Sequence, residues 1–207
     1  ETQGTVAPGL VAALAERITA VFGPGTMVRF RSSSNAEDDL RFKGTGKLVA
    51  GTSTALADRK MMYFTMNIGD NEPVYFDDST GIVSKGFTKA GNEWLVFYGT
   101  DPGTVTNDFG GGDFFHVDGF TSFQGIGSLG AATGSSSNSV NRFFIMTNSE
   151  GEGIDFRHDV DATIGNDIYV LGTGRIRTER RTSVNGQRFT FGDVYVNAGR
   201  TLVVESV

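Results

Sequence analysis

Apolar positions near the start of the chain follow a helical spacing. Between residues 8 and 22 they recur every three or four positions and form one stripe that includes Leu14 and Ile18. Pro8 suits a first helical turn, and Gly23-Pro24 is a stop signal. The pattern predicts an N-terminal amphipathic helix arm over residues 1–25. Its stripe, with Leu14 and Ile18, would cover a sheet or dock on a neighbouring subunit.

After residue 25 the pattern changes to short runs of the kind that form strands. Gly, Asn, Asp and Ser clusters separate these runs. They cover residues 27–31, 61–66, 74–76, 94–98, 142–146, 168–171, 188–196 and 201–205. Eight or nine strands with turn signals between them predict a mainly β domain over residues 26–207, an antiparallel sandwich, jelly roll or barrel.

Two further patterns refine this prediction. The clearest hairpin spans residues 175–196, because Asn185-Gly186 at its centre accepts the positive φ angles of a type I′ turn. No repeat of 20 to 50 residues is evident, which argues against a solenoid or propeller. The Gly/Ser/Ala tract at residues 125–139 predicts a long loop, and it is the place where the β-rich domain could divide.

Composition excludes several classes of protein and several kinds of site. The chain has 207 residues and no cysteine, which excludes disulfides, zinc–thiolate sites and thiol catalysis. No apolar run approaches about 18 residues, so we expect no transmembrane helix and no membrane partner. A net charge of −6 argues against nucleic acid as a general partner. Glycine, at 29 residues, and phenylalanine, at 17, are unusually frequent.

One segment carries a family resemblance. Residues 28–46 read VRFRSSSNAEDDLRFKGTG, which resembles the nucleotide-binding signature of the pyruvate phosphate dikinase and phosphoenolpyruvate synthase family. The resemblance implies an ATP-grasp-like site. In it Arg31 would contact phosphate, Ser32 and Ser33 would shape the turn, Glu37 would orient the site, and Gly44 and Gly46 would let the backbone approach the ligand. It covers about a tenth of the chain, and residues 39–41 depart from the family's pattern.

Both histidines have aspartates beside them. His116 and Asp118 would share one face of a strand, and His158 is followed directly by Asp159. Imidazole and carboxylate together suit a divalent transition metal, or a base with its orienting acid. A metal site would need the two segments to meet in space. The alternative is an ordinary hydrogen-bonded pair at each position.

Acidic turns offer a second kind of metal site. They lie at residues 70–72, at residues 77–78 and at Asp101. Oxygen-rich loops of this kind can hold a structural Ca²⁺, although no EF-hand spacing is present. We therefore expect no cofactor beyond, at most, a structural Ca²⁺ or another divalent metal, with solvated turns as the alternative.

Positive charge is concentrated between residues 175 and 188. The arginines there include Arg177, Arg180 and Arg181. Such a stripe can bind an acidic partner or the acidic face of another copy, so these three residues are candidate interface residues. The alternative is a solvated edge whose arginines oppose aggregation.

An aromatic-dense region begins at Trp94. With Tyr98 and Asp101 it is a candidate sugar-binding surface, because such surfaces combine aromatic platforms with acidic side chains. Phenylalanine outnumbers tryptophan and tyrosine here, and it lacks a polar edge. Core or subunit interface is therefore the competing interpretation.

No complete catalytic motif is present, which predicts a protein that is not an enzyme. The Gly-rich, Phe-rich, acidic and cysteine-free composition resembles structural proteins of phage particles, such as capsid decoration, tail or connector subunits. The predicted function is thus a structural subunit of a symmetric, virion-type assembly, made in the cytoplasm and found in a virion or extracellular particle. Its partners would be copies of itself and other assembly proteins. The alternatives are a carbohydrate-binding or adhesion module, with a glycan as partner, and a nucleotide-dependent phosphotransfer enzyme fragment.

Overall fold

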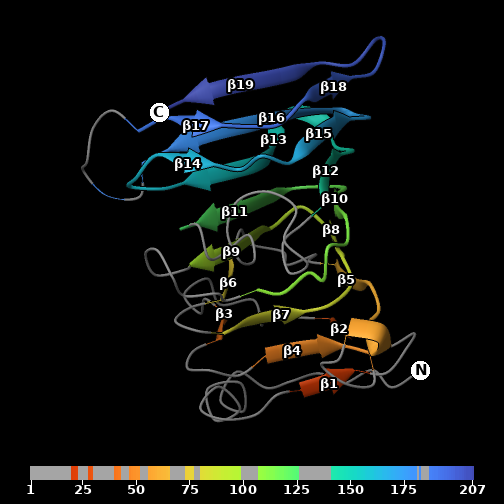
Figure 1. The fold of residues 1–207 in the computed structure, drawn as a ribbon. Helices are drawn as coiled ribbons and strands as arrows, with labels where there is room; N and C mark the ends of the chain where they lie inside the picture. The colour runs from red at the N-terminus through yellow and green to blue at the C-terminus, as the bar shows by residue number, and fades with distance from the viewer. Residues whose placement is uncertain are drawn as a thin grey trace.

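The chain forms a β-solenoid, in which parallel strands stack along one axis from the N-terminal to the C-terminal end (Figure 1). The computed structural model describes residues 20–22, 28–29, 40–42, 47–51, 56–65, 73–76, 80–98, 107–125, 141–180, 182 and 187–207. Every pairing between named strands in these residues is parallel.

Two seven-stranded sheets make up the body of the solenoid. In order of stacking, the first sheet contains β2 (Val28–Arg29), β5 (Met62–Thr65), β8 (Phe87–Ala90), β10 (Phe114–His116), β12 (Arg142–Ile145), β15 (Asp167–Val170) and β18 (Val194–Val196). The second sheet contains β3 (Leu40–Phe42), β6 (Val74–Phe76), β9 (Trp94–Tyr98), β11 (Phe120–Gln124), β13 (Asn148–Arg157), β16 (Thr173–Glu179) and β19 (Leu202–Ser206).

Two smaller sheets complete the described structure. A three-stranded sheet joins β1 (Ala20–Phe22), β4 (Lys47–Ala50) and β7 (Gly81–Val83). A two-stranded sheet joins β14 (Ala162–Thr163) and β17 (Phe189–Thr190). The one helical element of the described residues is the 3-10 turn η1 (Leu56–Asp58).

Each turn of the solenoid, or rung, adds one strand to each large sheet. Met62 pairs with Phe87, and Phe87 pairs with Phe114, so these two rungs take 25 and 27 residues. Phe114 pairs with Phe143, and Phe143 with Ile168, so the next two take 29 and 25. Each rung buries its apolar face only by stacking on its neighbours, as in other repeat folds.

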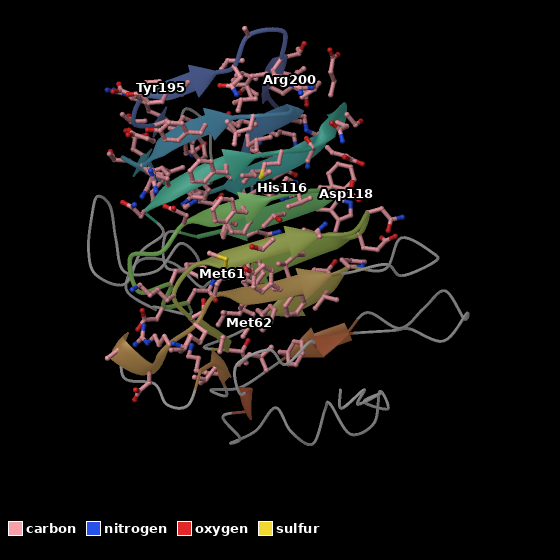
Figure 2. The ribbon with its side chains drawn as sticks, turned by 90° about the vertical axis from the view of Figure 1, so that its right-hand side faces the viewer. Met61, Met62, His116, Asp118, Tyr195 and Arg200 are labelled. Atoms are coloured by element: carbon pink, nitrogen blue, oxygen red, sulfur yellow. The ribbon has the colours of Figure 1, made fainter. Side chains whose placement is uncertain are left out.

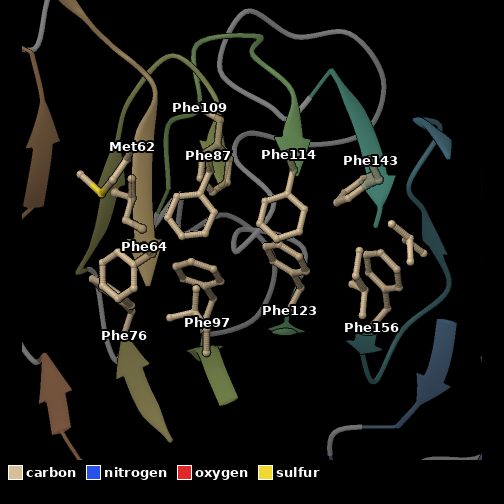
Figure 3. Close-up of a cluster of buried hydrophobic side chains, with 14 of the residues drawn as sticks. Met62, Phe64, Phe76, Phe87, Phe97, Phe109, Phe114, Phe123, Phe143 and Phe156 are labelled. Atoms are coloured by element: carbon tan, nitrogen blue, oxygen red, sulfur yellow. The ribbon is translucent and has the colours of Figure 1, made fainter. Parts of the chain in front are cut away.

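Stacked phenylalanine rings fill the space between the two large sheets (Figure 3). On the second sheet, Phe97 stacks on Phe123 with ring centroids 5.3 Å apart, and Phe123 stacks on Phe156 at 5.9 Å. Phe114 of the first sheet meets the Phe123 ring edge-on at 5.5 Å. These side chains are fully buried. Offset stacks and edge-to-face contacts of this kind are the favoured aromatic geometries.

The mainly β class is confirmed, but the predicted antiparallel sandwich, jelly roll or barrel is wrong, as is the argument against a solenoid. The register of the sheets shows why the repeat is not evident in the sequence. One inner row reads Met62, Phe87, Phe114, Phe143, Ile168 and Val194. Its members are all apolar but are not the same residue, and the rungs differ in length.

The predicted hairpin over residues 175–196 is also wrong. β16 pairs with β13 and β19, whereas β17 pairs with β14 and β18 with β15. Strands that follow one another in sequence therefore belong to different sheets. Hydrogen bonds join each strand to its counterpart one rung away, and residues 185–186 at the expected turn lie outside the described residues.

The predicted N-terminal helix is wrong where the structure describes the residues concerned. Residues 20–22, the end of the predicted helix, form strand β1, which pairs in parallel with β4. Leu14 and Ile18 lie outside the described residues, as does the Gly/Ser/Ala tract beyond Gly125. β11 and β13, on either side of that tract in sequence, pair directly with each other.

Candidate functional site

Two buried ionisable side chains share one inner row of the first sheet. An inner row of the first sheet reads Phe64, Lys89, His116, Ile145, Val170 and Val196 from rung to rung. Lys89 and His116 interrupt an otherwise apolar row, and both are 0% exposed. A buried charge or imidazole is costly unless its polar atoms have partners. The candidate site is therefore the corner where β8 and β10 turn towards the second sheet.

The Lys89 ammonium joins two successive corner turns. Its Nζ atom donates to the carbonyl oxygen of Gly91 at 2.5 Å and to that of Asp118 at 2.6 Å. Gly119 in the second turn has a φ of +68°, and a Cβ atom there would lie 2.5 Å from Nζ. Glycine thus provides both the left-handed turn and the space for the lysine.

The His116 imidazole fastens its own turn. Nε2 lies 2.9 Å from the carbonyl oxygen of Gly119, and Nδ1 lies 3.1 Å from Oγ1 of Thr121. A carbonyl oxygen only accepts, so Nε2 carries the proton and Nδ1 accepts from the hydroxyl. Both ring nitrogens of the neutral form are satisfied. In Figure 2, His116 and Asp118 lie together at one edge of the stack.

Burial shifts the pKa values of the ionisable groups at this corner. It lowers the pKa of Lys89 to about 7, although the charges of Asp118, Glu152 and Glu93 oppose that shift. Burial, followed by the nearby Lys89 charge, lowers the pKa of His116 to about 3, against the opposing hydrogen bond to Gly119. The pKa of Glu152 is raised, first by burial and then by the charge of Asp118. The corner therefore holds a neutral imidazole beside an amine that titrates near neutral pH.

This arrangement suits the fastening of turns better than chemistry on an external substrate. The amine and the imidazole are fully buried, and their hydrogen-bonding atoms are directed at main-chain and hydroxyl groups of the same corner. A reacting group must lie within hydrogen-bond reach of its substrate. The observed contacts hold consecutive turns in register instead.

The predicted four-residue metal site does not come together. His158 follows β13 and packs edge-on against Phe189, with ring centroids 5.6 Å apart. Asp159 accepts the backbone N–H of Thr182 at 2.6 Å. Within the described ranges, no group of three or more His, Asp or Glu side chains is placed to hold a metal ion. The acidic turns at 70–72, at 77–78 and at Asp101 lie outside those ranges.

The arginine stripe forms part of a charge network on the second sheet. Arg177 binds the buried carboxylate of Asp155 at 2.5 Å and lies 3.6 Å from Glu179. Arg175 lies 3.6 Å from both Asp155 and Glu205. Burial raises the pKa of Asp155, although Arg177 and Arg175 oppose that shift. Arg177 is thus engaged within its own chain.

The other two predicted interface arginines fall at the edge of this region. Arg180 follows β16 and is exposed, and Arg181 lies outside the described residues.

The aromatic candidates Trp94 and Tyr98 lie at opposite ends of β9. Phe120 covers one face of Trp94, with centroids 4.4 Å apart and planes 9° apart. The guanidinium of Arg177 lies 5.9 Å from the Trp94 ring. Four residues of strand span about 13 Å, so Trp94 and Tyr98 do not form one platform for a single sugar ring. Asp101 lies outside the described residues.

The residues of the nucleotide-binding resemblance lie outside the described part of the chain. They are Arg31, Ser32, Ser33, Glu37, Gly44 and Gly46. The flanking strands β2 and β3 are the first strands of the two large sheets.

Lys89 is not among the residues predicted from the sequence, although a signal for it exists. Phe87-Thr88-Lys89 and Phe114-Phe115-His116 occupy the same register positions in adjacent strands. Once the rungs are aligned, Lys89 and His116 stand where other rungs have apolar residues. An interruption shared by two adjacent rungs of an inner row is what marks this corner.

The last rung is the second feature with functional potential. β18 and β19 form one end of the large sheets, each with a strand neighbour on one side among the described residues. Val194 and Val196 are 45% and 46% exposed, whereas Ile168 and Val170, one rung below in the same rows, are buried. Val204 is 68% exposed above the buried Ile176. These three valines thus lie exposed on rows that are buried in the preceding rung.

Across the residues that the structure describes, no helix has the length and apolar character needed to cross a membrane. Comparison of the chain with protein-family models, with curated proteins and with solved structures gives no match.

Proposed function

We propose that this chain is a structural subunit of a symmetric assembly and that it acts through its solenoid surfaces rather than through catalysis. The observation that carries the proposal is the apolar surface of β18 and β19, where Val194, Val196 and Val204 are exposed on rows that are buried in the preceding rung. Exposed strand edges with apolar side chains pair readily with further strands. Apolar side chains that are exposed together on one surface favour association with another surface.

Two further observations support this role. Outer-face rings stack in a ladder that reaches the last rung, with Phe144 5.2 Å from Tyr169 and Tyr169 4.8 Å from Tyr195. Tyr195 itself is 46% exposed, so it offers an aromatic contact to a further strand. Lys89 and His116 are buried and hold turns together, which fits a scaffold. A virion-type particle as the setting stays a prediction from composition.

The test is the mass of the chain in solution. We expect wild-type protein to associate as its concentration rises, measured by light scattering after size exclusion and by negative-stain images of the same fractions. Replacing Tyr195 and Val204 together by lysine should shift half-association to a concentration about tenfold higher or more, because lysine on a strand edge opposes pairing. Both side chains are exposed, so the fold should survive.

A matched control places lysines elsewhere. Tyr63 and Val160 are also exposed, and neither belongs to the last rung. Their double lysine variant should associate like wild type. A wild-type chain that stays monomeric at every concentration would overturn the proposal. So would a last-rung variant that associates as well as the control.

A further inference from the structure

We propose that the outer face of the first large sheet binds an arginine-containing segment of a partner protein. The site combines two tyrosines and two aspartates of adjacent strands: Tyr169, Tyr195, Asp167 and Asp193. This inference goes beyond the proposed function, since it concerns the outer side of the sheet rather than the exposed valines. Three features of that side support it, namely an aromatic ladder, an acidic column and an arginine of the chain itself.

The aromatic ladder runs along the outer side of four adjacent strands. Phe115, Phe144, Tyr169 and Tyr195 pair in register from β10 to β18. Adjacent ring centroids lie 4.8, 5.2 and 4.8 Å apart. The first three rings are half-buried, and that of Tyr195 is exposed. Aromatic rings that remain accessible can attract a cation.

An acidic column lies next to the ladder on the same face. Arg142 pairs with Asp167, while Asp113 and Asp193 hold the corresponding places directly before β10 and β18. The column thus contains three aspartates and one arginine. The hydrogen bond with Asp193 and the charge of that carboxylate raise the pKa of Tyr195, and the Asp167 charge adds to the shift. The face is therefore complementary to a positively charged partner.

Arg142 shows how this face holds a guanidinium. Its Nε and Nη2 atoms donate to the two carboxylate oxygens of Asp113 at 3.0 and 2.7 Å. Its guanidinium carbon also lies 5.3 Å from the ring centroid of Phe144 and 6.0 Å from that of Tyr169. The carboxylate binds the edge of the planar group while the aromatic rings lie against it.

The next rungs repeat the same combination of groups. Asp167 and Asp193 each stand two positions before a tyrosine of the ladder, so carboxylate and ring share one face of the strand. Among the described side chains, neither aspartate forms an ion pair. Like charges on adjacent strands repel, and a cation between them offsets that repulsion. Arginine suits this place better than lysine, because only a planar guanidinium stacks on rings while it pairs with a carboxylate.

Binding of a labelled peptide tests the proposal. The probe is a capped peptide of four Gly-Arg repeats with an uncharged dye, followed by fluorescence anisotropy at low ionic strength. Matched peptides carry lysine or citrulline in place of arginine, citrulline being its uncharged isostere. The arginine peptide should bind at least about threefold more tightly than the lysine peptide. It should bind about tenfold more tightly than the citrulline peptide.

Variants locate the site on this face. Asp167→Asn together with Asp193→Asn should weaken binding of the arginine peptide about tenfold. Asparagine keeps the Oδ1 acceptor that Asp167 offers to the backbone N–H of Asp193, so the fold should survive, and circular dichroism melts check this. Tyr169→Leu should weaken binding about threefold. The control is Asp58→Asn together with Glu150→Gln, which changes net charge equally at exposed positions outside this face and should bind like wild type.

Several results would overturn the proposal. Wild type that does not bind the arginine peptide would do so. Equal binding of the arginine and lysine peptides, or equal losses in the double aspartate variant and its control, would leave only general attraction to an acidic protein. A double aspartate variant that binds the peptide normally but associates with itself less than wild type would assign this face to a second copy instead.

Discussion

Replacing Phe123 with alanine is expected to lower the free energy of unfolding by about 3–5 kcal/mol. Its ring is fully buried between those of Phe97 and Phe156 in the second sheet and meets Phe114 and Phe143 of the first. Alanine would remove apolar burial and leave a cavity that four aromatic neighbours cannot easily fill. Urea unfolding followed by circular dichroism measures the loss.

Tyr63→Ala is the matched control. Tyr63 is an aromatic residue two rungs away, but its side chain is 62% exposed. Its removal should change the free energy of unfolding by no more than about 0.5 kcal/mol. Similar losses in the two variants would contradict the description of the phenylalanine stack as the core of the solenoid.

Acidification from pH 6.5 to pH 3 is expected to destabilise the protein through His116. Burial lowers the pKa of this imidazole from 6.5 to about 3 in the folded state. In that interval the unfolded chain binds the proton and the folded chain does not, so stability is lost as the pH falls. The free energy of unfolding lost through His116 over this interval is several kcal/mol, about 5 at most.

His116→Gln isolates this contribution, because glutamine can hydrogen-bond but does not titrate. Carboxylates also titrate between pH 6.5 and 3 in both proteins, so the informative quantity is the difference between the two stability–pH curves. Urea midpoints at half-unit pH steps give both curves. The variant should be less stable than wild type near pH 7 and should lose less stability on acidification. Parallel curves would contradict a buried neutral imidazole.

Several strands could be predicted from the sequence, but their partners could not. The runs at 74–76 and 94–98 became β6 and β9 with the expected bounds. Alternation of apolar and polar positions is a property of a single strand, and it does not say whether the neighbour runs parallel or antiparallel. Phe97 and Phe123 lie side by side because one rung separates them, and that distance varies along the chain.

The candidate site, too, could be predicted only in part from the sequence. His116 and Asp118 lie at one corner, as their spacing predicts, and the partner that acts on both of them there is Lys89 from the preceding rung. Lys89 looks like a surface residue when its strand is considered alone. Its burial depends on which strand stacks beside it, and that is information about register. The ion pair of Arg177 depends on register in the same way, since Arg177 meets Asp155 across adjacent strands.

Each rung touches only its neighbours, so the number of rungs sets the length of the molecule. One rung adds about 4.8 Å along the axis, whatever the number of residues in its turns. Insertion or deletion of a rung of 25 to 29 residues would change the length of the rod by one fixed step and leave distant contacts unaltered. Loops can lengthen at the corners without altering that step, so reach and surface decoration can vary independently.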